Sequence, residues 1–235
     1  MENEKLPIKF FAPREVDELR IEGNKNPEKP KWVLQGEELK QRADCLQLSL
    51  DDLEAEFSTR KSSPVPFSFI AKLQSDATAK SKREDITNLF QQKSFGGVVG
   101  LTDTNKLIVS LNSLEELKEI SNRIKDYESN DYAISCIEDF EEFVPYIIKE
   151  EKECNYKIKL VDYQNYEQNL AMRRLLEYVL NKEGIDYTKT DYSEEYNIYK
   201  LRNLTEKALD NLEKTDIFNA LFSIEPMPKY MVSLD

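Results

Sequence analysis

Hydrophobic residues between positions 66 and 137 follow the pattern of one complete α/β unit. The first segment has apolar residues at every second position, which is typical of a half-buried strand. An amphipathic helix follows, and two short apolar runs on either side of residues 102–106 predict a hairpin. A capping box at Ser113 and Glu116 predicts the start of a second helix, and Ala133–Ile137 predicts a closing strand. The alternating positions of the first strand are Phe67, Phe69, Ala71 and Leu73.

A similar order of elements is repeated further along the chain. Ile134–Asp139 aligns with Leu221–Pro226, and at the same offset the first strand aligns with a segment that begins at Tyr156. Between these ends lie a helical pattern, two apolar runs separated by a polar turn, and a second helical pattern. Self-similarity of this kind indicates a repeated structural unit.

The repeat predicts an α+β fold with two tandem ferredoxin-like βαββαβ units, at residues 65–147 and 155–230. An N-terminal arm, residues 1–35, and a long helix, residues 36–60, precede them, and residues 231–235 follow as a tail. Each unit should have its own core, because the apolar positions fall on one face of each element. The expected core positions are Phe69, Leu89, Val109 and Leu117 in the first unit, and Leu160, Leu176, Ile198 and Leu209 in the second.

Apolar residues in the helix at residues 36–60 recur at spacings of four and three, as in a coiled-coil seam. Two interpretations are open: the helix packs along another helix of its own chain, or Leu46, Leu50 and Leu53 face a partner. The first is favoured, because only about three heptads are present, the lower limit for predicting a coiled coil. Trp32, the only tryptophan, should anchor the arm to a core.

Two segments read as linkers between these elements. Ser58–Pro66 is rich in serine and proline, and Glu141–Asn155 is strongly charged, so both are expected to be solvated. Gly96 and Gly97 resemble a phosphate loop, but they lead into a strand and not into a helix, so a turn is the expected structure.

The charge of the chain bears on its partners. Lys and Arg number 33 against 45 Asp and Glu, which gives a net charge of −12. A nucleic-acid partner is therefore not expected, since phosphate binding needs a strong basic patch. No apolar run is long enough to span a membrane, and the N-terminus lacks the apolar core of a signal peptide, so a cytoplasmic protein without a membrane partner is expected.

The chain contains no histidine, which removes catalytic triads, Cys-His dyads and the common zinc sites. Its three cysteines, Cys45, Cys136 and Cys154, are widely spaced, as ordinary thiols of a reducing compartment are. We therefore expect no catalytic residue, no metal site and no cofactor.

Several stretches near the two ends of the sequence form a recognisable set: Leu6–Phe11, Glu15–Gly23, Pro30–Leu34 and Ser223–Pro228. They resemble the region upstream of the catalytic domain in bacterial intracellular subtilisin-like serine proteases. Each βαββαβ unit is also similar to the inhibitor-type propeptide of subtilases, in its element order and in its final Ile-Glu strand, at Ile137-Glu138 and Ile224-Glu225. The catalytic Asp, His and Ser motifs of such proteases are missing here, so the resemblance implies an N-terminal region without its catalytic domain.

The resemblance implies a non-catalytic, prodomain-like module that binds a subtilisin-like catalytic domain, in cis or in trans, and assists its folding or restrains it. The helix-free face of a four-stranded sheet would dock onto the protease, and the tail after the last strand would enter the cleft as an extended segment. The expected protease-contacting residues are Glu225, Tyr230, Met231, Val232 and Ser233.

Other interpretations remain open at this point. The repeats could pack together as a structural spacer, or form a ligand-sensing pair with Gly96 and Gly97 at the ligand edge. The third alternative is an adaptor without a protease partner, which recruits another protein through the helix at residues 36–60.

Overall fold

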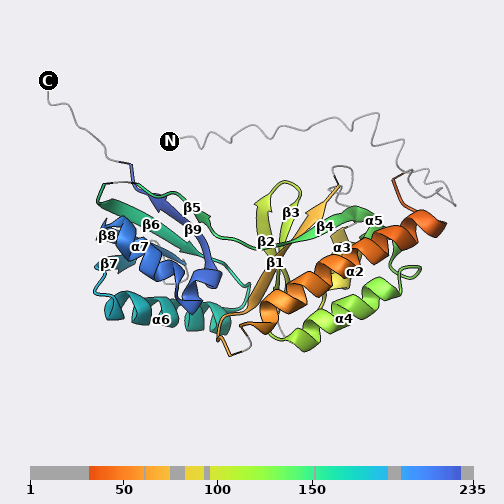
Figure 1. The fold of residues 1–235 in the computed structure, drawn as a ribbon, viewed down its shortest axis with the longest axis horizontal. Coiled ribbons are helices and arrows are strands. Elements are labelled where there is room, and N and C mark those ends of the chain that lie inside the picture. Colours follow the sequence, from red (N-terminus) through yellow and green to blue (C-terminus); the bar gives the residue numbers. More distant parts are fainter. Residues whose placement is uncertain are drawn as a thin grey trace, which may run out of the picture. The chain divides into compact units, whose positions relative to one another are not determined.

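A computed structural model of the chain describes residues 32–60, 62–74, 83–92, 96–150, 152–189 and 197–228 (Figure 1). All of the described residues belong to one compact unit, which begins at Trp32. Most of the expected N-terminal arm and the whole of the expected tail lie outside the described residues.

The first sheet has four antiparallel strands in the order β2-β3-β1-β4. Its strands are β1 (Phe67–Leu73), β2 (Gly97–Asp103), β3 (Lys106–Leu111) and β4 (Ile137–Glu142). Its helices are α2 (Gly36–Ser58), α3 (Arg83–Phe90), α4 (Leu114–Lys125) and α5 (Asp131–Cys136). The predicted cap is present, because the side chain of Ser113 accepts a hydrogen bond from the backbone N–H of Glu116 at the start of α4.

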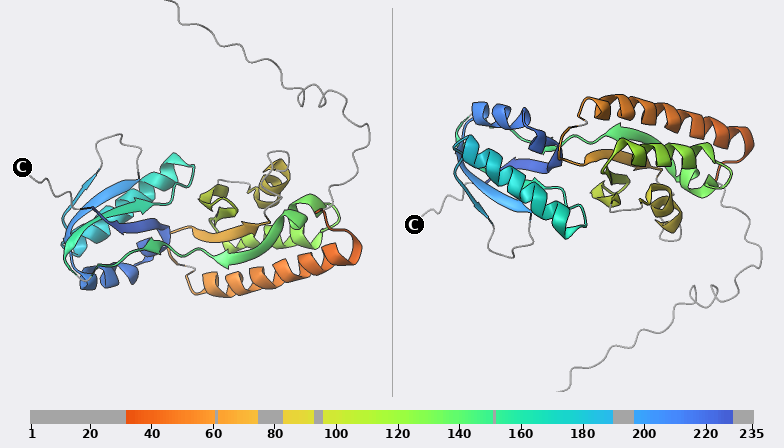
Figure 2. Two further views of the ribbon diagram at one scale, coloured as in Figure 1. Left: turned by 90° about the horizontal axis from the view of Figure 1, so that it is seen from above. Right: turned by 90° about the horizontal axis from the view of Figure 1, so that it is seen from below.

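Helix α2 belongs to the core of this first sheet. It contacts both α4 and β4, and Figures 1 and 2 show α2 and α4 side by side. Leu46, Leu50 and Leu53 are buried in the same apolar cluster as the expected core residues of the first unit. The partner-facing assignment of these three leucines is thereby corrected, since their apolar stripe is already covered by their own chain. Trp32 packs at the edge of this cluster, with its ring 6.3 Å from that of Tyr132.

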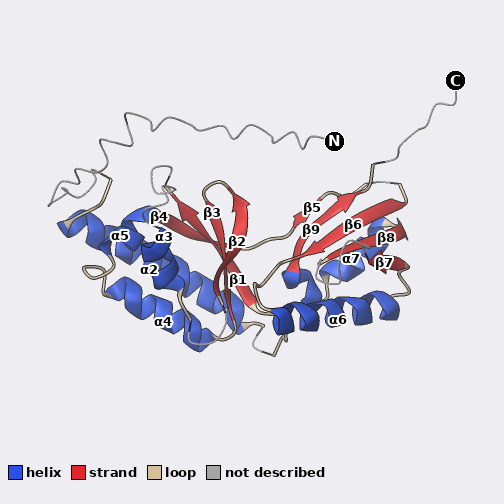
Figure 3. Ribbon diagram, turned by 180° about the vertical axis from the view of Figure 1, so that it is seen from behind, coloured by secondary structure: helices blue, strands red, loops and turns tan. Residues whose placement is uncertain are grey.

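The second sheet has five strands in the order β5-β9-β6-β8-β7 (Figure 3). Strand β5 pairs with β9 in parallel, and the other neighbours are antiparallel. Its strands are β5 (Tyr146–Ile147), β6 (Cys154–Leu160), β7 (Tyr187–Lys189), β8 (Ile198–Leu204) and β9 (Leu221–Pro226). Its helices are α6 (Tyr166–Lys182), α7 (Glu206–Glu213) and the short 3-10 helix η3 (Asp216–Ala220). Without β5, the strand order matches that of the first sheet.

The expected strand at Ala133–Ile137 is wrong for all but its last residue. Residues up to Cys136 form α5, and β4 begins at Ile137. The apolar run is buried on all sides, and such a run has no period that distinguishes a helical turn from a strand. The side chain of Asn130, the residue before α5, donates to the carbonyl oxygens of Arg123 and Asp126 and so ties the start of α5 to the end of α4.

One expected core residue of the second unit is on the opposite face of its sheet. Ile198 pairs with Lys159 and is only half-buried, whereas Tyr199 and Leu201 occupy the core. A shift of one residue moves a strand's side chains to the other face, because the side-chain period is two. The other expected core positions of both units are confirmed.

The segment Glu141–Asn155 is not the simple solvated linker that its charge suggested. Its middle residues form β5, and Phe143 just before them is buried. Further along, the Lys149 ammonium binds the carboxylates of Asp210 and Glu213 at 2.8 and 2.7 Å. The segment is therefore attached to the second sheet by strand pairing and by ion pairs with α7.

Candidate binding surface

The predicted protease-contacting residues lie only partly within the described structure. Glu225 is in β9, with its carboxylate 3.8 Å from the ammonium of Lys157. Tyr230, Met231, Val232 and Ser233 lie outside the described residues.

The two faces of the second sheet differ sharply. Its core face carries Tyr156, Ile158 and Leu160, which share one apolar cluster with buried residues of α6 and α7. The opposite face carries a set of basic side chains, because Lys157 pairs with Lys200 and alternate residues of a strand share a face. We call this surface the basic face; its cationic residues are Lys157, Lys159, Lys200 and Arg202.

The basic face remains accessible despite a few local contacts. The side chains of Lys157 and Arg202 are 45% and 51% exposed. Arg202 lies 3.6 Å from the carboxylate of Asp186, and the ammonium of Lys159 lies 4.5 Å from the ring centre of Phe222. Because ion pairs at this exposure are weak, the face keeps its positive character within a chain of net charge −12.

The corresponding face of the first sheet is covered in its apolar part. Ser68, Ile70 and Ile108 are at most 5% exposed, whereas the charged side chains at the other end of this face remain partly exposed. Ile70 and Ile108 belong to the same apolar cluster as the core of the second sheet, and Tyr163, which follows β6, is buried beside the hydroxyl of Ser68. Burial raises the pKa of Tyr163 well above its usual range, so this side chain stays neutral. Among the described residues, the apolar part of the helix-free face is therefore buried in the first sheet, whereas the second sheet exposes basic side chains on its helix-free face.

The glycine pair has a packing role. A Cβ atom at Gly96, where φ is +132°, would lie 2.8 Å from the carbonyl oxygen of Ser110. At Gly97, where φ is +91°, it would lie 2.8 Å from that of Phe90. Both glycines are therefore explained by close backbone approach and positive φ, and neither needs a ligand.

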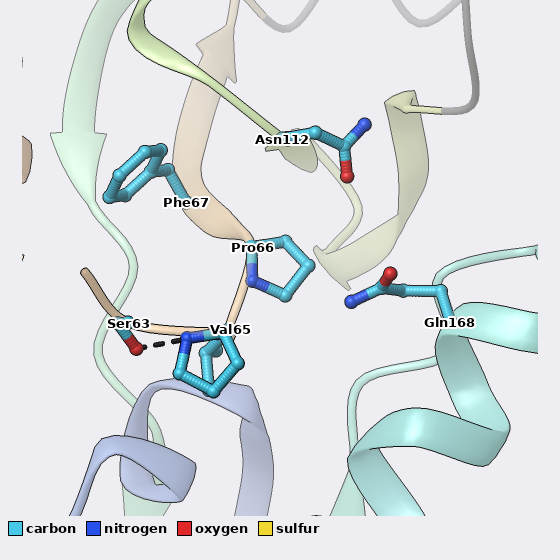
Figure 4. Close-up of a pocket in the computed structure, with 7 residues that line it drawn as sticks. Ser63, Val65, Pro66, Phe67, Asn112 and Gln168 are labelled. Carbon is cyan, nitrogen blue, oxygen red and sulfur yellow. Dashed lines mark hydrogen bonds between the residues drawn. The ribbon is translucent and has the colours of Figure 1, made fainter. Parts of the chain in front are cut away.

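A small cavity lies where the segment before β1 meets Asn112 and Gln168 (Figure 4). Its volume is about 100 Å³, and the hydroxyl of Ser63 at its edge accepts a hydrogen bond from the backbone N–H of Val65. This volume is below the range of roughly 300–1,000 Å³ that is usual for ligand pockets, so we regard the cavity as part of the packing.

A larger groove of about 470 Å³ lies between the covered face of the first sheet and strands β5 and β9. Its walls combine apolar side chains with four carboxylates and one ammonium group. We call it the acidic groove. Its lining residues include Ile70, Phe143, Val144, Tyr146 and Phe222, together with Asp103, Lys106, Glu141, Glu142 and Glu225.

The basic face has a signal in the amino-acid sequence. Lys157 and Lys159 alternate with Ile158 and Leu160, and Lys200 and Arg202 flank Leu201, which is the period-two pattern of a strand with one basic face. The acidic groove has no such signal, because β5 lies in a charged segment that the sequence predicts to be a linker.

The described residues contain no cluster of three or more potential metal ligands, and none of their helices is long and apolar enough to cross a membrane. Comparisons of the chain with protein-family models, with curated proteins and with solved structures found no match.

Proposed function

We propose that this chain is a non-catalytic protein-binding module, built from two ferredoxin-like units, that docks onto a subtilisin-like catalytic domain. The docking assists the folding of that domain or restrains its activity. The observation that carries the proposal is the open basic face of the second sheet.

The ferredoxin-like assignment rests on strand order. In each sheet the first and third strands of the βαββαβ unit are central, and the fourth and second strands flank them. In the first unit, α3 lies between the first two strands, and α4 and α5 lie between the last two. In the second unit, α6 lies between the first two strands, and α7 and η3 lie between the last two. This order and connectivity are those of the split βαβ fold, which the inhibitor-type propeptides named above also have.

The choice of docking surface follows from which sheet face is free. The apolar centre of the helix-free face of the first sheet is buried by its own chain. The exposed lysines at the end of this face, Lys72 and Lys106, are bound to Glu138 and Glu141 at 3.0 and 2.9 Å. The helix-free face of the second sheet exposes Lys157, Lys159 and Arg202. Beyond the end of β9, the backbone N–H of Met227 donates a hydrogen bond to the carbonyl oxygen of Asn155. Met227 therefore remains attached to this sheet.

The proposal is tested with the cognate subtilisin-like catalytic domain. We expect the two proteins to co-elute in size-exclusion chromatography, and the catalytic domain to show lower activity or a higher refolding yield in the mixture. Lys157→Glu with Lys159→Glu should weaken the complex by at least about tenfold, because both charges reverse on the docking face. The matched control, Lys40→Glu with Lys118→Glu, makes the same charge change at exposed lysines of α2 and α4 and should leave the affinity within about twofold.

Two results would contradict the proposal. One is the absence of co-elution together with unchanged protease activity and unchanged refolding yield. The other is equal weakening by the two double variants, which would mean that net charge and not the basic face governs binding.

A further inference from the structure

We infer that the acidic groove is a second binding site, which takes a short extended peptide segment carrying lysine or arginine between apolar residues. This inference does not depend on the proposed protease partner. It rests on an exposed apolar stripe, the size of the groove and the charge of its walls.

The apolar stripe runs along β5 and its flanking residues. Val144, Tyr146 and Ile148 are 65%, 61% and 36% exposed, and they occupy every second position. Alternate residues of an extended segment point to the same side, so these three side chains form one surface. Strand β5 is at the end of the strand order and has a neighbour on one side only among the described residues. An exposed apolar stripe on an edge strand is a surface suited to another extended segment.

The stripe continues into the groove. Val144 and Tyr146 line it, and Ile70 and Phe143, each 5% exposed, are further apolar members of its wall. Because Tyr146 pairs with Ser223, its side chain lies on the helix-free side of the second sheet, near Phe222. A volume of about 470 Å³ has room for a few side chains and not for a helix or a folded domain, so the occupant is a short segment.

The charge of the walls selects a cationic occupant. Lys106 is the one cation among the lining residues, and it is bound to Glu141 at 2.9 Å. Asp103 and Glu142 are exposed, and the carboxylate of Glu225 lies 3.8 Å from the ammonium of Lys157. The exposed ring of Tyr146 suits the same ligand, because aromatic faces attract cations, whereas the ring of Phe222 already carries the ammonium of Lys159.

A second copy of this chain is a poor occupant by the same reasoning. Each copy carries a net charge of −12, and two stripes paired edge to edge would bring the carboxylates of both grooves together. Like charges across an interface oppose association. A basic segment of a different protein meets no such repulsion.

Binding is measured by fluorescence anisotropy with two labelled probes, a short peptide of alternating valine and lysine and a matched peptide of alternating valine and glutamate. We expect the lysine peptide to bind at least about tenfold more tightly than the glutamate peptide at low salt, and to lose affinity as salt is added. Val144→Ser with Tyr146→Ser should weaken binding of the lysine peptide by about tenfold or more. The matched control, Leu48→Ser with Tyr178→Ser, changes equally exposed residues on α2 and α6 and should have no effect.

All four side chains are exposed, so both double variants should fold, which circular dichroism checks. Equal affinity for the two probes would overturn the inference, and so would an unchanged affinity of the Val144→Ser, Tyr146→Ser variant. Self-association of the unmodified chain in sedimentation analysis that disappears in the same variant would also overturn it, by assigning the stripe to a second copy. Because no protease is present in these assays, their failure would leave the proposed function untouched.

Discussion

Leu46 provides a direct test of the position of helix α2. The side chain is fully buried in the cluster that joins α2 to the first sheet, whereas Leu48 on the same helix is 66% exposed. Leu46→Ala removes buried carbon atoms and leaves a cavity, which costs about 3 kcal/mol of unfolding free energy at a well-packed site. Leu48→Ala should change the unfolding free energy by no more than about 0.5 kcal/mol, because its side chain makes little buried contact.

Urea unfolding followed by tryptophan fluorescence is the appropriate assay. Trp32 is the only tryptophan, and it packs at the edge of the same cluster, so its emission reports on this core. For a chain of this length, about 3 kcal/mol corresponds to a fall in melting temperature of roughly 6–12 °C. A loss below about 1 kcal/mol for Leu46→Ala, or equal losses for Leu46→Ala and Leu48→Ala, would refute the packing of α2 described above.

Three further predictions follow from local geometry. Gly97→Ala should destabilise the chain by at least about 1 kcal/mol more than Gly184→Ala in urea unfolding. Both glycines have positive φ, but of the two only Gly97 has a backbone oxygen where a Cβ atom would lie. Equal losses of unfolding free energy in the two variants would contradict this prediction. Lys149→Met should lower the unfolding free energy at neutral pH, because a hydrogen bond to Asp210 raises the pKa of Lys149 and lowers the pKa of Asp210. The difference in unfolding free energy between the variant and the unmodified chain should therefore fade as pH falls below about 4 or rises above about 10. A difference that does not change with pH would contradict this prediction. Cys45 is exposed and the other two thiols are buried, so one thiol per chain should react rapidly with a thiol reagent and two only on unfolding; rapid reaction of all three would contradict the burial.

Local periodicity determined most of the secondary structure of this chain. The spacing of Leu46 and Leu50 predicted a long amphipathic helix, and the alternation from Phe67 to Leu73 predicted the first strand; both are present as α2 and β1. The repeated order of elements also appears in the matching strand orders of the two sheets. These features follow from the sequence because a helix or strand that buries one face shows its period directly in the positions of its apolar residues.

The tertiary structure decided what local periods do not encode. The run before β4 is buried on every side, so its period does not distinguish a strand from the helix α5 that it forms. The charged segment after β4 forms β5 by pairing with β9. The side chain of Tyr163 helps to cover the helix-free face of the first sheet, while the equivalent face of the second sheet keeps its lysines exposed. Which face stays open depends on contacts between residues distant in sequence, such as Tyr163 and Ser68, and a period of two or of 3.6 residues carries no information about them.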